Sequence, residues 1–134
     1  MDALYPRLLV EDFATAADFW TAALRELLGI EPVKVIPEAG YANWDLNGEG
    51  VLVLFSRAAV AAVVGTEALP ARPTGQDASM LVFRVDSVDD AAPCLAAHGA
   101  EIVADPQDRP AWGPGLRTAH LRTPDGTLVE LQSY

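Results

Sequence analysis

The spacing of apolar residues along the chain switches between an extended and a helical period. Residues 5–10 are typical of a first strand, and Pro6 suits its beginning. Apolar residues then recur at steps of three and four from 13 to 27, which predicts one face of a helix. Asp12 is a suitable N-cap and Gly29 a suitable C-terminal stop for this helix. Three further strands are predicted, over 32–36, 41–46 and 51–55.

The same order of elements starts again after a short predicted helix over 57–65 and a proline-containing connector over 66–77. A strand over 79–85 precedes a helix that Ser87 caps and Gly99 ends. We expect Val88, Ala91, Leu95 and His98 to form the inner stripe of that helix. Strands are predicted over 101–104, 116–122 and 127–132, with a long loop over 105–115.

The last two of these strands are joined by Thr123-Pro124-Asp125-Gly126. Proline fixes φ near the value that a turn needs, and glycine accepts positive φ, so this sequence predicts a hairpin. On the final strand Val129 and Leu131 share one face, whereas Leu128, Glu130 and Gln132 share the other. Glu130 is therefore a carboxylate in an otherwise apolar setting.

A constant offset of 75 residues relates the two halves at the junction of strand and helix, where it matches Val10 with Val85 and Asp12 with Ser87. We therefore predict an α+β fold of two βαβββ units, over 1–56 and 79–134, joined by a helix and linker over 57–78. A unit that leaves one sheet face bare must pair to bury it.

The end of the chain resembles the vicinal oxygen chelate superfamily. The resemblance rests on Trp112-Gly113 in a loop, a strand, the Pro-Asp-Gly turn, and Glu130-Leu131. This superfamily includes glyoxalase I, extradiol dioxygenases, fosfomycin-modifying enzymes and bleomycin-resistance proteins. The chain is most similar to the metal-free, drug-binding bleomycin-resistance type. The resemblance implies that the two units pair into a half-open cup.

The resemblance also implies where a metal would be held in the family's enzymes, by two histidines and two glutamates. The histidine positions fall on Tyr5 and Met80, and the strand over 51–55 has no glutamate. Only Glu130 matches. A thioether and a neutral phenol are poor ligands for a hard divalent ion, so we predict no metal and no cofactor. Without a metal, a desolvated Glu130 needs a cation or a donor, which a ligand or a neighbouring arginine such as Arg117 or Arg122 would supply.

Other catalytic groups are few. His98 suits the end of its helix, and Cys94 suits a packing position. His120 is a candidate general base whose face the pattern leaves open. No motif for a nucleophile or a phosphate-binding glycine loop is present.

Aromatic residues supply the other candidates for ligand binding. Trp112 lies among prolines in a loop, where it either marks a binding surface or folds back onto its own sheet. The resemblance implies that Trp112 and Gly113 contact the planar part of a drug, although Pro114-Gly115 is an insertion relative to the pattern. Trp44 and Phe55 are each either cup residues or core residues. Tyr5 and Met80, at the positions of the family's histidines, are counted among the ligand-binding candidates together with Glu130.

The net charge of −10 argues against a nucleic-acid partner. It is typical of a soluble acidic protein and also favours a cationic ligand. No apolar run reaches the roughly 18 residues of a membrane span. The N-terminus does not resemble a signal peptide, and one cysteine permits no internal disulfide, so we expect a cytoplasmic location.

Three functional hypotheses follow. The first is a metal-free binder of an aromatic small molecule, for which the acidic charge favours a cation, such as a bleomycin-, enediyne- or mitomycin-like antibiotic, that confers self-resistance. The second is a glyoxalase-like lyase or isomerase, or a dioxygenase-type enzyme, with a non-standard site. The third is a structural or regulatory module with a closed cup. Exposed sheet edges also favour a homodimer.

Overall fold

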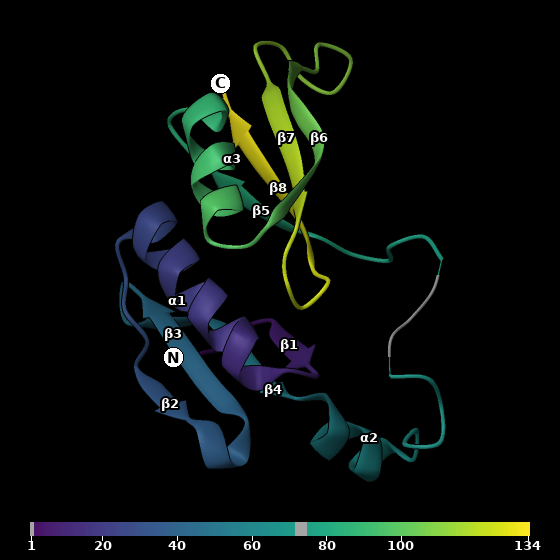
Figure 1. Cartoon of the computed structure of the whole chain (residues 1–134). Helices are drawn as coiled ribbons and strands as arrows, with labels where there is room; N and C mark the ends of the chain where they lie inside the picture. Colours follow the sequence, from purple (N-terminus) through teal and green to yellow (C-terminus); the bar gives the residue numbers. More distant parts are fainter. Residues whose placement is uncertain (1, 72–74) are drawn as a thin grey trace. The chain divides into compact units, whose positions relative to one another are not determined.

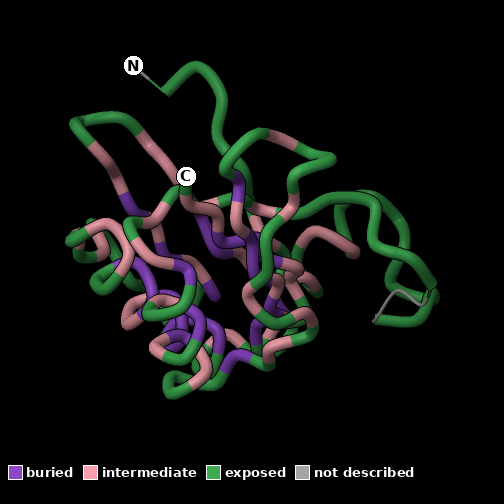
Figure 2. The backbone as a smooth tube through the Cα atoms, turned by 90° about the horizontal axis from the view of Figure 1, so that it is seen from above, coloured by how far each residue is buried: buried purple, intermediate pink, exposed green. Residues whose placement is uncertain are grey.

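The computed structural model of the chain describes residues 2–71 and 75–134. The chain divides into two compact units, Met1–Gly75 and Gln76–Tyr134. Part of the predicted connector, at 72–74, lies outside the described residues. In Figure 2 the buried residues are concentrated in the helices and strands, and the described connector residues 65–71 and 75–80 are exposed. Along the described parts of the chain, no helix is both long and apolar enough to cross a membrane.

Unit 1 has the predicted order of elements. They are β1 (Arg7–Val10), α1 (Phe13–Leu28), β2 (Lys34–Ile36), the 3₁₀ turn η1 (Pro37–Ala39), β3 (Tyr41–Leu46), β4 (Glu49–Ser56) and α2 (Arg57–Val64). The sheet order is β1-β4-β3-β2, with β1 parallel to β4 and the other pairs antiparallel. Asp12 caps α1 by accepting the Thr15 N–H at 3.2 Å, and Gly29 ends the helix at φ 67°.

Unit 2 repeats this topology (Figure 1). Its elements are β5 (Leu81–Arg84), α3 (Val88–Ala97), β6 (Glu101–Asp108), β7 (Arg117–Arg122) and β8 (Leu128–Ser133), in the sheet order β5-β8-β7-β6. Ser87 caps α3 by accepting the Asp90 N–H, as predicted. The mixed α+β class, with two four-stranded sheets and three helices, is confirmed.

Two details of unit 2 differ from the prediction. Strand β6 continues to Asp108, through residues assigned to a loop, because Pro106 lies on an edge strand within the register shift between Ala104 and Gln107. On α3 the buried residues are Val88, Ala92 and Leu95, whereas Ala91 is only partly buried and His98 is exposed. At the middle of α3, the residue that packs against the sheet is therefore Ala92 and not the predicted Ala91.

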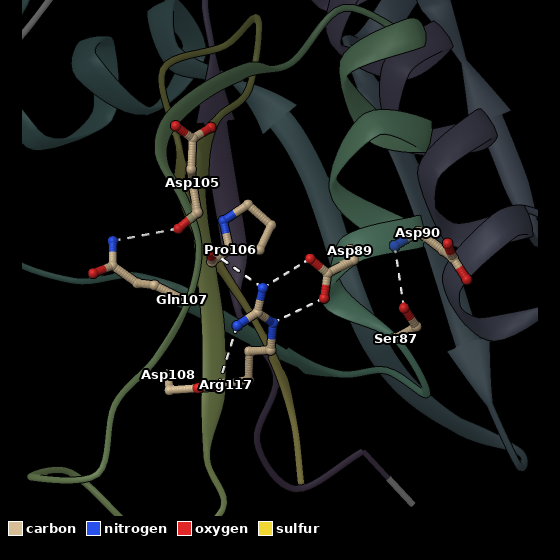
Figure 3. Close-up of polar contacts among 8 residues, drawn as sticks. All are labelled: Ser87, Asp89, Asp90, Asp105, Pro106, Gln107, Asp108 and Arg117. Carbon is tan, nitrogen blue, oxygen red and sulfur yellow. Dashed lines mark hydrogen bonds and ion pairs between the residues drawn. The ribbon is translucent and has the colours of Figure 1, made fainter.

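One face of the unit 2 sheet is covered by α3, which contacts β6, β7 and β8. The covered face carries Ala119, Leu121, Val129 and Leu131, all buried. Arg117 belongs to the same face and forms ion pairs with Asp89 of α3 at 2.8 Å and with Asp108 of β6 at 3.2 Å (Figure 3). The hydrogen bond from Arg117 holds the pKa of Asp89 below its ordinary value. The bonds to Asp89 and, to a smaller extent, to Asp108 raise the pKa of Arg117.

The opposite face of each sheet is called its open face here. In unit 2 it consists of alternate residues of three strands: Val82 and Arg84, Thr118 and His120, and Glu130 and Gln132. In unit 1 it consists of Arg7 and Leu9, Tyr41 and Asn43, and Val53 and Phe55. The Pro-Asp-Gly hairpin fixes the register of β7 and β8, since the Gly126 N–H donates to the Thr123 carbonyl at 2.9 Å.

Candidate functional site

Glu130 lies at the centre of β8, between β5 and β7, and is only 5% exposed. Both of its carboxylate oxygens have partners. Oε1 lies 2.9 Å from Nε2 of His120, and Oε2 accepts from Nε2 of Gln132 at 3.1 Å. The prediction that Arg117 or Arg122 pairs with Glu130 is wrong. Arg117 binds Asp89 and Asp108, and Arg122 binds Asp77.

His120 faces Glu130 directly across the β7–β8 ladder. Alternation along the strand left its face undecided, and the register places it on the open face. An Nε2–H directed at the carboxylate leaves Nδ1 as the basic atom of the ring, because a neutral imidazole has one donor and one acceptor nitrogen. The pair is therefore equipped to hold a proton or transfer it to a neighbouring molecule.

Trp112 lies in the turn between β6 and β7 and is 60% exposed. Its ring packs edge-on against His120, with 6.1 Å between centroids, and the Arg109 guanidinium lies 4.9 Å from the indole centroid. Arg109 also donates from Nε to Oγ1 of Thr118 at 3.1 Å, which ties the turn to the open face.

The turn is ordered by its own backbone. The N–H groups of Trp112 and Gly113 both donate to the Arg109 carbonyl, and the Leu116 N–H donates to the Gly113 carbonyl. The Pro114-Gly115 insertion fits because Gly115 adopts a φ of 72°. Trp112 and Glu130, which are 18 positions apart, are thus joined through His120.

The remaining candidates lie elsewhere in the two units. Tyr5 precedes β1 and is 37% exposed, and Met80 precedes β5 and is 42% exposed. Phe55 is on the open face of unit 1, where Arg7 lies 5.2 Å from its ring centroid and Tyr41 packs edge-on against it. Trp44 is fully buried on the other face of that sheet, together with Ala42 and Leu54, so its placement among ligand-binding residues is corrected to a core role.

Arg84, Arg109 and Gln132 were not among the sequence-based candidates. The alternation along the last strand places Gln132 on the same face as Glu130, and this could have identified Gln132 as a candidate. Arg84 shares that face by register with Gln132, which no pattern within a single strand reveals. Arg109 lies in a segment that was assigned to a loop.

The donor set does not fit the metal of the family's enzymes. Register makes Val53 of β4 the equivalent of Glu130, because each pairs with the residue five positions before its unit's helix cap. Valine has no donor atom. Tyr5 and Met80 offer a phenol and a thioether, and both oxygens of Glu130 are already engaged by His120 and Gln132. A hard divalent ion needs several oxygen or imidazole ligands, which these positions do not supply.

Comparison with known proteins places this architecture in a family. Residues 4–131 match the model of the Glyoxalase/Bleomycin resistance protein/Dioxygenase superfamily. The chain is 34% identical over 131 residues to the Uncharacterized protein YraH of Bacillus subtilis (strain 168), covering 98% of this chain and 97% of YraH.

Two solved structures show the same fold. A glyoxalase-related enzyme from Fulvimarina pelagi has a TM-score of 0.74 at 22% identity, covering 100% of this chain and 88% of its own. A glyoxalase/bleomycin resistance protein/dioxygenase family enzyme from Burkholderia phytofirmans PsJN has a TM-score of 0.73 at 16% identity, covering 99% and 98%. With its duplicated βαβββ topology and this match along nearly its whole length, the chain belongs to the glyoxalase/bleomycin resistance protein/dioxygenase superfamily.

Proposed function

We propose that this protein is a metal-free binder of planar aromatic small molecules, most simply an antibiotic-sequestering protein of self-resistance. The observation that carries the proposal is Trp112, a large ring left 60% exposed although it is fixed in place by Arg109 and His120. An exposed ring on an ordered turn has a preset orientation, so a flat ligand that stacks on it loses little entropy in ordering the protein.

The polar groups connected to Trp112 through His120 support the same proposal. Glu130, Gln132 and His120 already satisfy one another, so a stacking ring does not have to compensate a buried charge. Such a surface favours burial and stacking over covalent or metal anchorage.

A melting-temperature screen tests this function. The panel contains a bleomycin-type glycopeptide, an enediyne and a mitomycin-like quinone, each tested against the protein and its Trp112→Ala variant. We expect at least one compound to raise the melting temperature of the parent and to have little effect on the variant. Equal shifts in both proteins would place the ligand elsewhere.

Elemental analysis of protein purified without chelator addresses the metal. We expect far less than one equivalent of zinc, nickel, iron or manganese per chain. A near-stoichiometric amount of any of them would refute a metal-free function.

A second candidate function is metal-free acid–base catalysis of the lyase or isomerase type. It is favoured by the His120–Glu130 contact of 2.9 Å on the open face. Its test is exchange in D₂O of an acidic C–H next to a carbonyl, with Glu130→Gln as the comparison. Enzyme-dependent exchange that the variant lacks would support catalysis, and exchange at the background rate would leave binding as the function.

We also propose a homodimer. The edge strand β2 of unit 1 exposes Val35 and Ile36, and Val33 before it is 53% exposed. An exposed apolar edge is a favourable place for a second copy to pair. Light scattering at micromolar concentration tests this, and a monomeric mass would contradict it.

A further inference from the structure

The arginines of unit 2 fall into two groups. Arg117 and Arg122 form ion pairs with aspartates. Arg84 and Arg109 instead lie against aromatic rings, 4.1 Å from the centroid of Tyr134 and 4.9 Å from that of Trp112. Within the described ranges 2–71 and 75–134, neither of these two guanidiniums has a carboxylate partner. In a chain of net charge −10, two such cations on one sheet are unexpected.

Both guanidiniums belong to the open face of unit 2. Arg84 is the β5 neighbour of Gln132 on β8, and Gln132 faces Thr118 on β7. Thr118 accepts the Nε–H of Arg109. Arg84 and the Nε of Arg109 therefore lie at the two ends of the Gln132–Thr118 pair. The strands of Arg84 and Thr118 are two strand spacings of about 4.8 Å each apart.

The two aromatic rings lie at the same end of the sheet. Trp112 is followed by Gly113, and a Cβ at Gly113 would lie 4.0 Å from the hydroxyl of Tyr134. Tyr134 and Trp112 are 65% and 60% exposed. Each arginine thus has its own exposed ring, and the two rings approach each other through the Gly113 backbone.

The charge that remains for a ligand on this face is positive. The carboxylate of Glu130 is 5% exposed and both of its oxygens are engaged. A guanidinium over an aromatic ring can still donate from its terminal N–H groups, and these match the two oxygens of a carboxylate.

From these contacts we infer that the open face of unit 2 is an anion subsite, and that its ligand is a planar aromatic carboxylate. Arg84 and Arg109 bind the carboxylate, while Trp112 and Tyr134 contact the ring. The inference rests on the proposed binding function and narrows it, because the overall acidic charge had favoured a cationic ligand and the local charges favour an anionic one.

Three naphthalene probes of matched shape test the inference: 2-naphthoate, 2-naphthamide and 2-naphthylmethylammonium. Titration is followed by tryptophan fluorescence and calorimetry. We expect naphthoate to bind about tenfold or more tightly than naphthamide, since charge-assisted hydrogen bonds exceed neutral ones by that order. The ammonium probe should be the weakest of the three.

Variants assign the effect to residues. Arg84→Gln should reduce naphthoate affinity several-fold, with the remaining preference over naphthamide due to Arg109, and leave naphthamide binding unchanged. Lys34→Gln removes one positive charge from exposed β2 of unit 1 and should change neither affinity. Trp112→Ala should weaken all three probes together, because it removes the ring contact and keeps the charges.

The outcomes separate the two proposals. Equal binding of naphthoate and naphthamide overturns the anion subsite and leaves the aromatic binder standing. If no naphthalene probe binds, the proposed binding of aromatic ligands fails at this site. The anion subsite is then tested separately, by following the NMR signals of the arginine Nε–Hε groups during a titration with sodium acetate. Saturable shifts at Arg84 and Arg109, without shifts at the ion-paired Arg25, would support it. Unchanged signals would overturn it.

Discussion

The two units share one topology and carry different chemistry at matched positions. Counting from the helix caps Asp12 and Ser87 and from the strand registers, Val53 corresponds to Glu130 and Asn43 to His120. By the same alignment Phe55 corresponds to Gln132. The open face of unit 1 is therefore largely apolar and aromatic, whereas that of unit 2 carries an acid–base pair and an amide.

The helix-covered faces differ much less. Leu54, Ala42 and Trp44 in unit 1 and Leu131, Ala119 and Leu121 in unit 2 are all completely buried. Apolar contacts under the helix maintain the fold in both units, so the open face is free to vary. This explains how one duplicated scaffold carries the His120–Glu130 pair in one copy only.

One ion pair between the helix and the sheet is found in unit 2 and has no counterpart at the matched positions of unit 1. The ion pair between Arg117 and Asp89 connects β7 with α3 (Figure 3). The matched positions in unit 1 are Gly40 and Ala14. Gly40 has a φ of 60°, and a Cβ there would lie 3.0 Å from the Cβ of Ser56, so a side chain has no room.

The largest expected effect is the loss of folding stability in Trp20→Ala, which distinguishes a core tryptophan from the exposed Trp112. Trp20 of α1 is 1% exposed, and truncating a buried large aromatic residue costs about 3–5 kcal/mol. Urea unfolding measures this loss. Trp112→Ala is the matched control and should change the free energy of unfolding little. Similar losses in the two variants would identify Trp112 as a packing residue and misplace the site.

Val53→Glu gives unit 1 the carboxylate of unit 2 without its partner. Val53 is 5% exposed, and its β1 neighbour Arg7 lies on the same face, so the substitution is made in an Arg7→Gln background that removes this cation. An unpaired buried charge then costs about 3 kcal/mol or more, so unfolding should become easier by that order. Adding Asn43→His supplies the cross-strand partner and should recover part of the loss. If Val53→Glu leaves the free energy of unfolding unchanged, the open face of unit 1 is not the apolar counterpart of the open face of unit 2.

Trp112→Ala should produce the next largest effect, on affinity. Stacking adds about 0.5–1.5 kcal/mol beyond the buried area. Burial of the indole adds about 2 kcal/mol. Since about 1.4 kcal/mol is tenfold, affinity for an aromatic ligand should fall by about two orders of magnitude. Phe55→Ala, in the matched unit, should have a smaller effect, and calorimetry compares the two. A greater loss at Phe55 would move the site to unit 1.

The smallest effect concerns acid stability. Hydrogen bonds from Arg117 hold the pKa of Asp89 below its ordinary value of 3.8. A lowered pKa in the folded state stabilises the protein above the ordinary value, and this contribution is lost as the pH falls through the folded-state pKa. Asp89→Asn should therefore lower the free energy of unfolding at neutral pH. Below about pH 4 the free energy of unfolding of this variant should fall less steeply with decreasing pH than that of the parent. Denaturation curves at stepped pH measure this, and an unchanged slope would mean that the bond adds nothing.

Much of the fold was predictable because its signals are local. The caps Asp12 and Ser87 and the glycine stop at Gly29 need only their immediate neighbours, and all three occur as predicted. Strand β6 was predicted too short, because a register shift on an edge strand makes Pro106 acceptable there and leaves no mark on hydrophobic spacing.

The candidate site was predictable only in part. Parity along β8 placed Glu130 apart from Val129 and Leu131, and the register agrees. The role of Trp44 remained open, because alternation separates the two faces of a strand without showing which of them a helix covers.

The sequence by itself determined the order of the elements, the duplication and the isolation of Glu130, because these follow from spacing, capping and turn chemistry within short segments. Only the tertiary structure decided which side chains meet. The pairing of β7 with β8 brings His120 to Glu130, and the β6–β7 turn brings the Trp112 ring to His120. Contacts between strands depend on register and on which face is covered, and these are fixed when the whole sheet assembles on its helix.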